Sequence, residues 1–471
     1  MAIFFISVAA LILGYIIYGT IVDRIFGSDQ NRTTPAVAME DGVDFVPMPT
    51  WKVALIQLLN IAGVGPIFGP ILGALYGPAA LVWIVIGCIF AGGVHDYFSG
   101  MLSMRHDGSS IPEIVGDNLG NGMKQIMRGF SVILLLLVGI VFVSAPAQLL
   151  TNLTPLSMPV LITIIFCYYF IATILPVDKI IGKIYPIFGF CLVFMAVSLI
   201  TMLMVKGYTL YPQRTFANLS PNNLPMWPLI FITIACGALS GFHATQSPLM
   251  ARCLTNEKYG RPVFYGSMIM EGIIALIWAT LAMSFFHTPG ELGTMLGEGG
   301  PAQVVNHISK TLLGTGGGIL AIIGVVFLPI SSGDTAFRSA RLIIADVLKM
   351  SQKENSKRLL IAIPLFAIGF IVSKTDFGVI WRYFGWANQT LATIVLWTAA
   401  AYLVKQGKNH WIASIPATFM TAVVACFLIY SPDIGFRQPM NVATIGGITA
   451  AIGSAVLFLY RTKTVKKRGL K

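Results

Sequence analysis

Five ionisable residues lie inside apolar stretches that are long enough to cross a membrane. They are His95, Asp96, His243, Glu271 and Asp334. An ionised side chain at the centre of a bilayer costs roughly 2.5 to 3.5 kcal/mol on insertion scales, so such residues are functional candidates by default. Imidazole and carboxylate groups exchange protons, and carboxylates also bind small cations. The sequence therefore predicts an ion-coupling site built from these residues.

The densest polar patch surrounds Asp334. Ser331 and Ser332 precede it, and Thr335 and Arg338 follow it. Hydroxyl and carboxylate oxygens at this density are hard ligands of the kind that Na⁺ requires, and the carboxylate is equally a place where protonation can be coupled to transport. A second interpretation is an i,i+4 ion pair between Asp334 and Arg338 that neutralises both groups and fixes the helix. The two interpretations are compatible if the pair opens during the cycle.

The other ionisable residues allow both functional and structural interpretations. His95 and Asp96 are consecutive, so they point about 100° apart on a helix and at most one of them faces a given partner directly. A histidine near a carboxylate titrates near neutral pH, which suits proton coupling, whereas a buried, hydrogen-bonded histidine beside a helix-ending Asp96 is the structural alternative. Glu271 has no basic neighbour in sequence, so it is either protonated or paired with another helix.

Two apolar stretches carry helix-breaking and polar residues at their centres. The first contains Asn60, Gly63, Gly65, Pro66, Gly69, Pro70 and Gly73, and the second contains Gly237, Ser240, Gly241, His243, Thr245, Gln246, Ser247 and Pro248. Proline within a helix removes a hydrogen bond and clashes with the preceding turn, and a broken helix at bilayer depth is tolerated only inside protein or beside a cavity. Close packing by glycine and proline is the alternative interpretation.

Peptide groups freed at such breaks, and the N-termini of half-helices, can bind an anionic group. We therefore expect substrate-binding residues at both breaks and in the polar pair Asn388 and Gln389, which could instead join helices by hydrogen bonds. The expected substrate-binding residues are Asn60, Gly63, Gly65, Pro66, Ser240, Gly241, His243, Thr245, Gln246, Asn388 and Gln389. A group of aromatic residues, Trp381, Tyr383, Phe384 and Trp386, is expected to anchor the chain at a membrane interface.

The composition predicts a membrane bundle as the scaffold for these residues. Of 471 residues, 56% are apolar and 11% are charged, against about 25% charged in soluble proteins, which argues against an ordinary soluble enzyme. Near-continuous apolar runs favour helices over a barrel, whose strands would alternate. About thirteen transmembrane helices are predicted, near residues 3–22, 51–76, 79–104, 128–150, 157–175, 184–206, 227–250, 262–287, 315–347, 358–373, 378–404, 410–430 and 441–460.

Basic residues predict the orientation of this bundle. With the C-terminus in the cytoplasm, all but six of the 31 Lys and Arg residues fall on the cytoplasmic side of a thirteen-helix chain, which puts the N-terminus outside. The net charge of +12 is accounted for by these loops and tails, and it forms no aromatic-interleaved patch of the kind that binds nucleic acid. The expected partners are the lipid bilayer and a small-molecule substrate, and the oligomeric state is left open.

The order of the helices predicts an internal repeat. Residues 51–206 and 227–404 hold five predicted helices each, and a unit with an odd number of spans must insert upside down when it is repeated. Residues 1–50 form an extra N-terminal helix and cytoplasmic loop, and residues 410–471 form two additional helices and a basic tail. We expect an all-α, five-plus-five inverted repeat in which the first and sixth core helices are broken.

Several motifs, in order along roughly residues 1–460, resemble the carbon starvation protein A family. They are GVGPIFGP at 63–70, GGVHDYFSGMLSMRHDGSSIPEIVG at 92–116, SGFHATQSP at 240–248, YGSMIMEG at 265–272, SGDTAFRSAR at 332–341 and FGWANQTLA at 384–392. The resemblance implies a bacterial inner-membrane transporter for peptides or pyruvate, proton-coupled in some members. It also implies the amino acid-polyamine-organocation fold, in which sodium-using members place oxygens of the eighth core helix opposite the first break.

The chain also departs from the better-known members of that family. It has Gln57, Leu58, Leu59 and Asn60 where they carry a histidine pair and small residues, and it stops soon after its last predicted helix. It is therefore similar to a shorter branch of the family.

The prediction is an ion-coupled secondary transporter, driven by protons or Na⁺, that takes up peptides or small carboxylates such as pyruvate by alternating access. A channel, or a ligand-sensing membrane protein without coupled transport, is the alternative. The sequence contains neither a GxxxxGK[ST] nor an HExxH motif, so we do not expect a P-loop ATPase or a zinc protease of the usual kind. We expect no cofactor beyond the coupling ion. The six cysteines are interpreted as core residues, and His95, Asp96, His243 and Asp334 lack the local spacing of a metal site.

Overall fold

The computed structural model describes most of the chain, namely residues 2–42, 44–174, 177–209, 215–221, 223–350, 352 and 354–469. The side chains at 173–185, 331 and 463–469 are outside this description. Within it the chain is almost entirely helical, and the one β-bridge pairs Met48 with Leu254.

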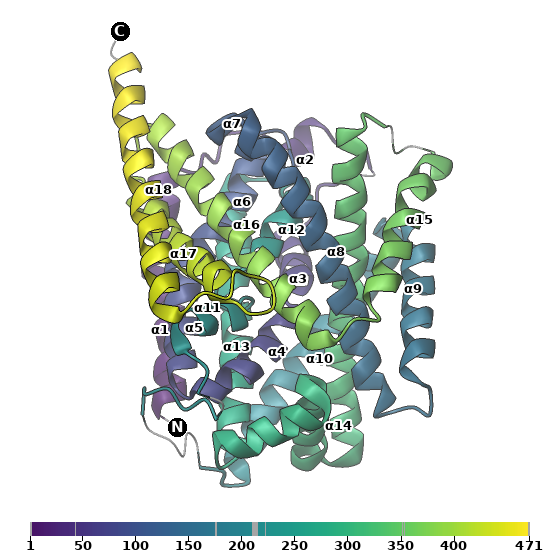
Figure 1. Cartoon of the computed structure of the whole chain (residues 1–471). Coiled ribbons are helices and arrows are strands. Elements are labelled where there is room, and N and C mark those ends of the chain that lie inside the picture. The colour runs from purple at the N-terminus through teal and green to yellow at the C-terminus, as the bar shows by residue number, and fades with distance from the viewer. Residues whose placement is uncertain are drawn as a thin grey trace.

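The helices form one bundle, with the two termini at opposite ends (Figure 1). In chain order the elements are α1 (Ala2–Phe26), α2 (Pro35–Ala38), α3 (Thr50–Ile61), α4 (Gly65–Gly73), η1 (Ala74–Tyr76), α5 (Ala79–Gly87), η2 (Cys88–Gly92), α6 (Gly93–Arg105), α7 (Ile111–Leu119), α8 (Asn121–Thr151), α9 (Met158–Ile174), α10 (Val177–Val205), α11 (Met226–Thr233), α12 (Gly241–Ala251), η3 (Glu257–Tyr259), η4 (Arg261–Tyr265), α13 (Gly266–Phe285), α14 (Pro289–Val347), α15 (Asn355–Val372), α16 (Phe377–Lys405), α17 (Trp411–Tyr430) and α18 (Met440–Gly469).

Ten helices among the described residues are long and apolar enough to span a membrane. The pair α3 and α4, bent by 48°, makes an eleventh span if it is counted as one. The predicted runs at 157–175 and 227–250 are occupied by α9 and by the pair α11 and α12, which are too short to be counted in this way. The chain is therefore a multi-pass, all-helical membrane protein.

The segment α14 includes helical turns before the predicted helix at 315–347, and its last part, after the break at Gly314, coincides with that helix. It starts at Pro289, whereas the sequence indicated a loop as far as residue 314. The backbone leaves helical geometry at Gly299, Gly300 and Gly314, and Gly300 and Gly314 have positive φ. These glycines gave the segment a loop-like sequence, and in the structure they interrupt it, so residues 289–347 form shorter helices in series rather than one continuous helix. The short helix α7 was also not predicted.

Both predicted helix breaks are present. Residues 62–64 separate α3 from α4, and residues 234–240 separate α11 from α12. A stripe of glycines on α4 packs directly on the second break: a Cβ at Gly65 would lie 2.3 Å from the Cβ of Cys236, and one at Gly73 would lie 2.4 Å from the side chain of Ile234. The two breaks therefore touch, and glycine is what permits this approach.

Candidate functional site

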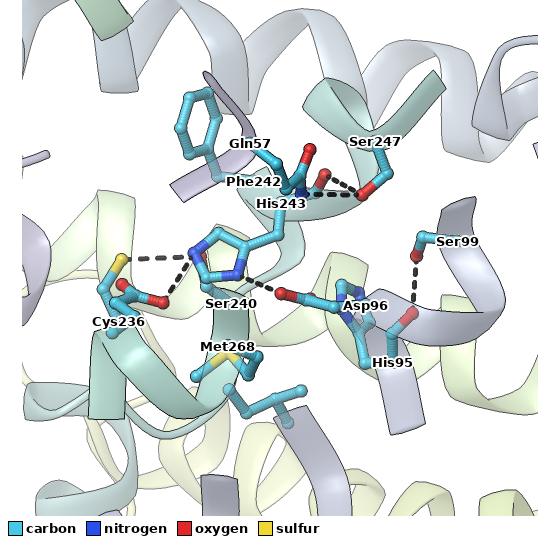
Figure 2. A network of polar contacts seen from close by, with 12 residues as sticks. Gln57, His95, Asp96, Ser99, Cys236, Ser240, Phe242, His243, Ser247 and Met268 are labelled. Atoms are coloured by element: carbon cyan, nitrogen blue, oxygen red, sulfur yellow. Dashed lines mark hydrogen bonds and ion pairs between the residues drawn. The ribbon is translucent and has the colours of Figure 1, made fainter. Parts of the chain in front are cut away.

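A buried polar network lies against the second break, and Asp96 of α6 is at its centre. Asp96 Oδ1 is 2.7 Å from Nδ1 of His95, and Asp96 Oδ2 is 2.8 Å from Nδ1 of His243 on α12. All three side chains are fully buried (Figure 2). The consecutive residues His95 and Asp96 thus contact each other, and only Asp96 reaches across to the broken helix. This contact joins α6 to α12.

Glu271 of α13 extends the network on the other side of His243. Its Oε2 lies 3.3 Å from Nε2 of His243, so Glu271 is paired with another helix, which is one of the two arrangements the sequence left open. The pair is close but poorly aligned, since neither oxygen of Glu271 has a hydrogen-bond partner of good geometry among the described residues. His243 therefore bridges two buried carboxylates.

Polar side chains also hold the second break. Asn388 of α16 donates to Oγ of Ser240 at 3.1 Å and accepts from the backbone N–H of Phe242 at 2.7 Å, which caps the start of α12. Gln389 donates to the carbonyls of Phe231 and Leu239 at 3.1 and 3.0 Å. Both residues therefore satisfy peptide groups that the break frees, which is the helix-joining alternative raised from the sequence.

Two residues that the sequence analysis did not select also satisfy this break. Trp83 of α5 donates its indole N–H to the carbonyl of Ile234 at 3.1 Å, and Cys88 contacts the carbonyls of Gly237 and Met268. Cys236 lies in the break itself, next to His243 in Figure 2. The sequence analysis interpreted Cys236 as a core cysteine. Its position beside Gly237, within a predicted break, could have identified it as a candidate site residue.

The first break has fewer polar contacts of this kind. Ser332 of α14 donates to the carbonyls of Leu59 and Leu328 at 3.1 and 3.0 Å. Gln57 of α3 donates to Ser247 of α12 at 3.4 Å, and Asn60 is buried. Gly63 packs under the ring of Phe142, and Pro66 lies in the first turn of α4, which begins at Gly65. The two broken helices are therefore joined both by glycine packing and by a side-chain hydrogen bond.

The remaining predicted residues on α12 are turned toward their own helix. Thr245 donates to the carbonyl of Phe242, and Gln246 donates to Oγ1 of Thr245 at 2.9 Å. Oε1 of Gln246 is buried with no hydrogen-bond partner in the described part of the chain. Gly241 packs on the backbone of α16, where a Cβ would lie 2.3 Å from the carbonyl oxygen of Asn388.

Asp334 lies outside the His243 network. It is buried, and its Oδ2 is 3.4 Å from a guanidinium nitrogen of Arg338, which also donates to the carbonyl of Ala172 on α9. Oδ1 has no hydrogen-bond partner among the described residues. Thr335 donates to the carbonyl of Ser332 on its own helix, and the side chain of Ser331 is outside the described residues. The Asp334–Arg338 pair of the second interpretation is therefore present in the structure.

Two cavities open toward opposite ends of the bundle. One, of about 770 Å³, is lined by Thr233 of α11, Trp381 of α16 and the first part of α14 at the end where the N-terminus lies. The other, of about 330 Å³, is lined by Thr245 and Pro248 of α12 and by α7 at the opposite end (Figure 1). Asp96, His243 and Glu271 line neither cavity and are fully buried, so the network is closed to both.

The aromatic group on α16 is only partly placed as predicted. Tyr383 is 42% exposed, but Trp381 and Phe384 are buried. Trp381 packs against Phe68 of the first broken helix and Phe377. The interfacial-anchor prediction is wrong for Trp381 and Phe384, because Trp381 packs on Phe68 of α4 and Phe384 packs on Trp381.

Comparison with known proteins identifies the family. The profile described as "Carbon starvation protein CstA" matches residues 1–165, 130–292 and 290–426. The chain belongs to the CstA family. This confirms the resemblance carried by the motifs.

Relatives in the CstA family come from several bacteria. An uncharacterized membrane protein of Haemophilus influenzae is 47% identical over 63% of this chain and 94% of its own length. The proteins named peptide transporter CstA in Campylobacter jejuni and Escherichia coli are 27% and 25% identical, over 88% and 92% of this chain and 78% and 82% of their own lengths.

Among solved structures, a manganese transporter of Eremococcus coleocola has a similar fold. Its TM-score is 0.52 at 13% identity, over 91% of this chain and 99% of that one. A point mutant of the same transporter gives a TM-score of 0.53 at 12% identity, over 89% and 98%. At this identity the likeness concerns the fold alone.

Proposed function

We propose that this CstA-family protein is a secondary transporter that takes up peptides or small carboxylates such as pyruvate, coupled to a gradient of protons or Na⁺. The observation that carries the proposal is the closed polar network against the second helix break, with a cavity toward each end of the bundle. A buried site between two separate cavities is what alternating access requires of an intermediate that is closed to both sides. The relatives named peptide transporter CstA support the substrate class.

The proposed architecture is a thirteen-span chain with a five-plus-five inverted repeat. Residues 51–206 and 227–404 are the two repeats, and the broken pairs α3 with α4 and α11 with α12 open them. The termini lie at opposite ends, in keeping with an odd number of spans (Figure 1). We propose that the N-terminus faces outward across a bacterial inner membrane and that residues 410–471 add two helices and the cytoplasmic tail.

The substrate would bind where the breaks meet. The start of α12 presents backbone N–H groups and the positive end of a helix dipole, which favours a carboxylate. In this structure the N–H of Phe242 donates to the side-chain oxygen of Asn388. We therefore propose that the carboxylate of the substrate replaces or reorients the Asn388 amide. Gly65, Pro66, Ser240 and Gly241 let the backbone approach the substrate.

The coupling ion would act through Asp334 on α14. Asp334 is buried with one oxygen unpaired among the described residues, and Arg338 at 3.4 Å neutralises it incompletely. Two residues earlier, Ser332 holds the carbonyl of Leu59 next to the first break. Binding of a proton or Na⁺ at Asp334 would weaken the Asp334–Arg338 ion pair and shift α14. The shift would change the contact of Ser332 with Leu59 beside the first break.

A transport assay tests the proposal. Purified protein in proteoliposomes should accumulate radiolabelled pyruvate or a dipeptide against its gradient when a proton or Na⁺ gradient is imposed, with pH and Na⁺ varied separately. Asp334→Asn should abolish uphill uptake while the protein remains folded, and Asp117→Asn, at an exposed site on α7, should leave it intact. Flux that is non-saturable and indifferent to both gradients would favour the channel alternative and contradict the proposal.

A further inference from the structure

Three potential metal ligands converge at the second break. One ligand atom each from Cys236, His243 and Glu271 lies within 4.8 Å of the other two, and all three residues are buried. They come from three separate segments: the break itself, α12 and α13. The proposed transport mechanism gives no role to the thiol of Cys236.

The spacing suits a small tetrahedral cation. With metal–ligand bonds of about 2.0 to 2.3 Å, neighbouring ligands of a tetrahedral site lie about 3.4 Å apart. Nε2 of His243 and Oε2 of Glu271 are already 3.3 Å apart. The sulfur of Cys236 lies within 4.8 Å of both atoms.

The surroundings orient His243 as a ligand. Asp96 Oδ2 lies 2.8 Å from Nδ1 of His243, which leaves Nε2 directed at Glu271 and Cys236 (Figure 2). A carboxylate that accepts the second N–H of a histidine fixes the ring and raises its basicity toward a metal. Asp96 is therefore a positioning residue for the site.

Glu271 is the second, independent indication of a ligand. Both of its oxygens are buried; Oε2 contacts Nε2 of His243 at 3.3 Å in poor alignment, and Oε1 has no hydrogen-bond partner in the described residues. A buried polar group without a partner is costly, and native structures that retain one usually leave room for an ion or a water. One oxygen of Glu271 lies within 4.8 Å of both the sulfur and the imidazole nitrogen.

We propose that Cys236, His243 and Glu271 bind one transition-metal dication of the Zn²⁺ class, with a fourth coordination position left open. One sulfur, one nitrogen and one carboxylate suit Zn²⁺ and Co²⁺, whereas Mg²⁺ and Ca²⁺ require oxygen ligands. The ion reaches the site through either cavity when the bundle opens. Because it ties the break to α13, it holds the closed arrangement and inhibits uptake; this last step rests on the proposed function.

Binding is tested on the purified full chain without any transport. The protein should take one equivalent of Zn²⁺ from a chromophoric chelator. Bound Co²⁺ should produce a thiolate-to-metal charge-transfer band. An excess of Mg²⁺ should displace neither Zn²⁺ nor Co²⁺ from the protein. Cys236→Ser should remove the band, and Glu271→Gln should weaken Zn²⁺ binding at least about tenfold. Asp96→Asn should weaken it about 10- to 100-fold but retain the band. Cys191→Ala, at a buried cysteine on α10, is the control and should retain both the charge-transfer band and Zn²⁺ binding.

Absence of the band in the wild-type protein, or its persistence in Cys236→Ser, would overturn the site. The transport arm is separate: Zn²⁺ should inhibit uptake by the wild-type protein and not by Cys236→Ala. Inhibition that is unchanged in Cys236→Ala would contradict the inhibitory role. If no variant transports any substrate, the proposed function fails, and the binding result still decides the metal site.

Discussion

The two helix breaks differ in how their unpaired peptide groups are accommodated inside the bundle. The first break is three residues long and depends on close packing, with Gly63 under Phe142 and Gly65 on Cys236. The second is seven residues long and depends on hydrogen bonds: Trp83 and Gln389 donate to peptide carbonyls at and beside the break, and Asn388 accepts from a peptide N–H. A short break leaves few peptide groups to satisfy, whereas a long one needs a polar partner for each of them. The polar chemistry of the protein therefore gathers at the second break.

The largest effect is expected at the contact between the breaks. Gly65→Ala should destabilise the protein by about 3 kcal/mol, because the new methyl group would lie 2.3 Å from Cβ of Cys236. Thermal unfolding in detergent measures the loss. Gly129→Ala on α8, where a Cβ meets nothing within 4 Å, should be neutral or stabilising. Adding Cys236→Gly should restore part of the loss; if the double variant is no more stable than Gly65→Ala, the contact is not the cause.

The second break should be the more sensitive to loss of a polar side chain. Gln389→Leu leaves the carbonyls of Phe231 and Leu239 without their shared donor, and we expect a loss of about 2 kcal/mol in the free energy of unfolding. Thr390→Val, which removes a hydroxyl bonded to its own helix, is the matched control. Equal effects of the two substitutions would show that the break does not depend on this amide.

The sequence predicted both breaks for a physical reason. Proline and glycine act locally, so Pro66 and Gly237 reveal an interruption without knowledge of any partner. The contacts could not be predicted in this way, because His243 meets Asp96 and Glu271 from helices 147 and 28 residues distant in the sequence. Asp334 illustrates the limit: the sequence identified Arg338 as its i,i+4 partner, but not the contact of the same guanidinium with the carbonyl of Ala172 on α9.

At the first break a polar substitution should matter less. Ser332→Ala removes one donor shared by the carbonyls of Leu59 and Leu328, and the expected cost is about 1 kcal/mol. Ser198→Ala, whose hydroxyl bonds to carbonyls of its own helix α10, serves as the control. A loss larger than that of Gln389→Leu would reverse the comparison between the breaks.

The smallest effect is expected for the ion pairs of Glu113 with Lys124 and Arg128, which lie away from both breaks. They show how much a polar contact outside the breaks contributes to stability. Partial burial raises the pKa of Glu113, but hydrogen bonds and charge from Lys124 and Arg128 outweigh this and lower the pKa below its usual value. These ion pairs therefore stabilise the protein above the unfolded-state pKa, and this is lost as the pH falls through the lower folded-state pKa. Glu113→Gln should cost only a few tenths of a kcal/mol at neutral pH. Loss of stability equal to that of Gln389→Leu would contradict this ranking.

The central claim is that the two cavities open in turn around the closed network. It is tested most directly by thiol labelling of Leu75→Cys and Leu249→Cys, which line the cavities at the two ends, in a chain whose exposed Cys167 is replaced by serine. A membrane-impermeant reagent should label the two positions in opposite senses as substrate and ion gradient are varied, with one rising when the other falls. Labelling that rises at both positions together, or that substrate leaves unchanged at both, would contradict alternating access.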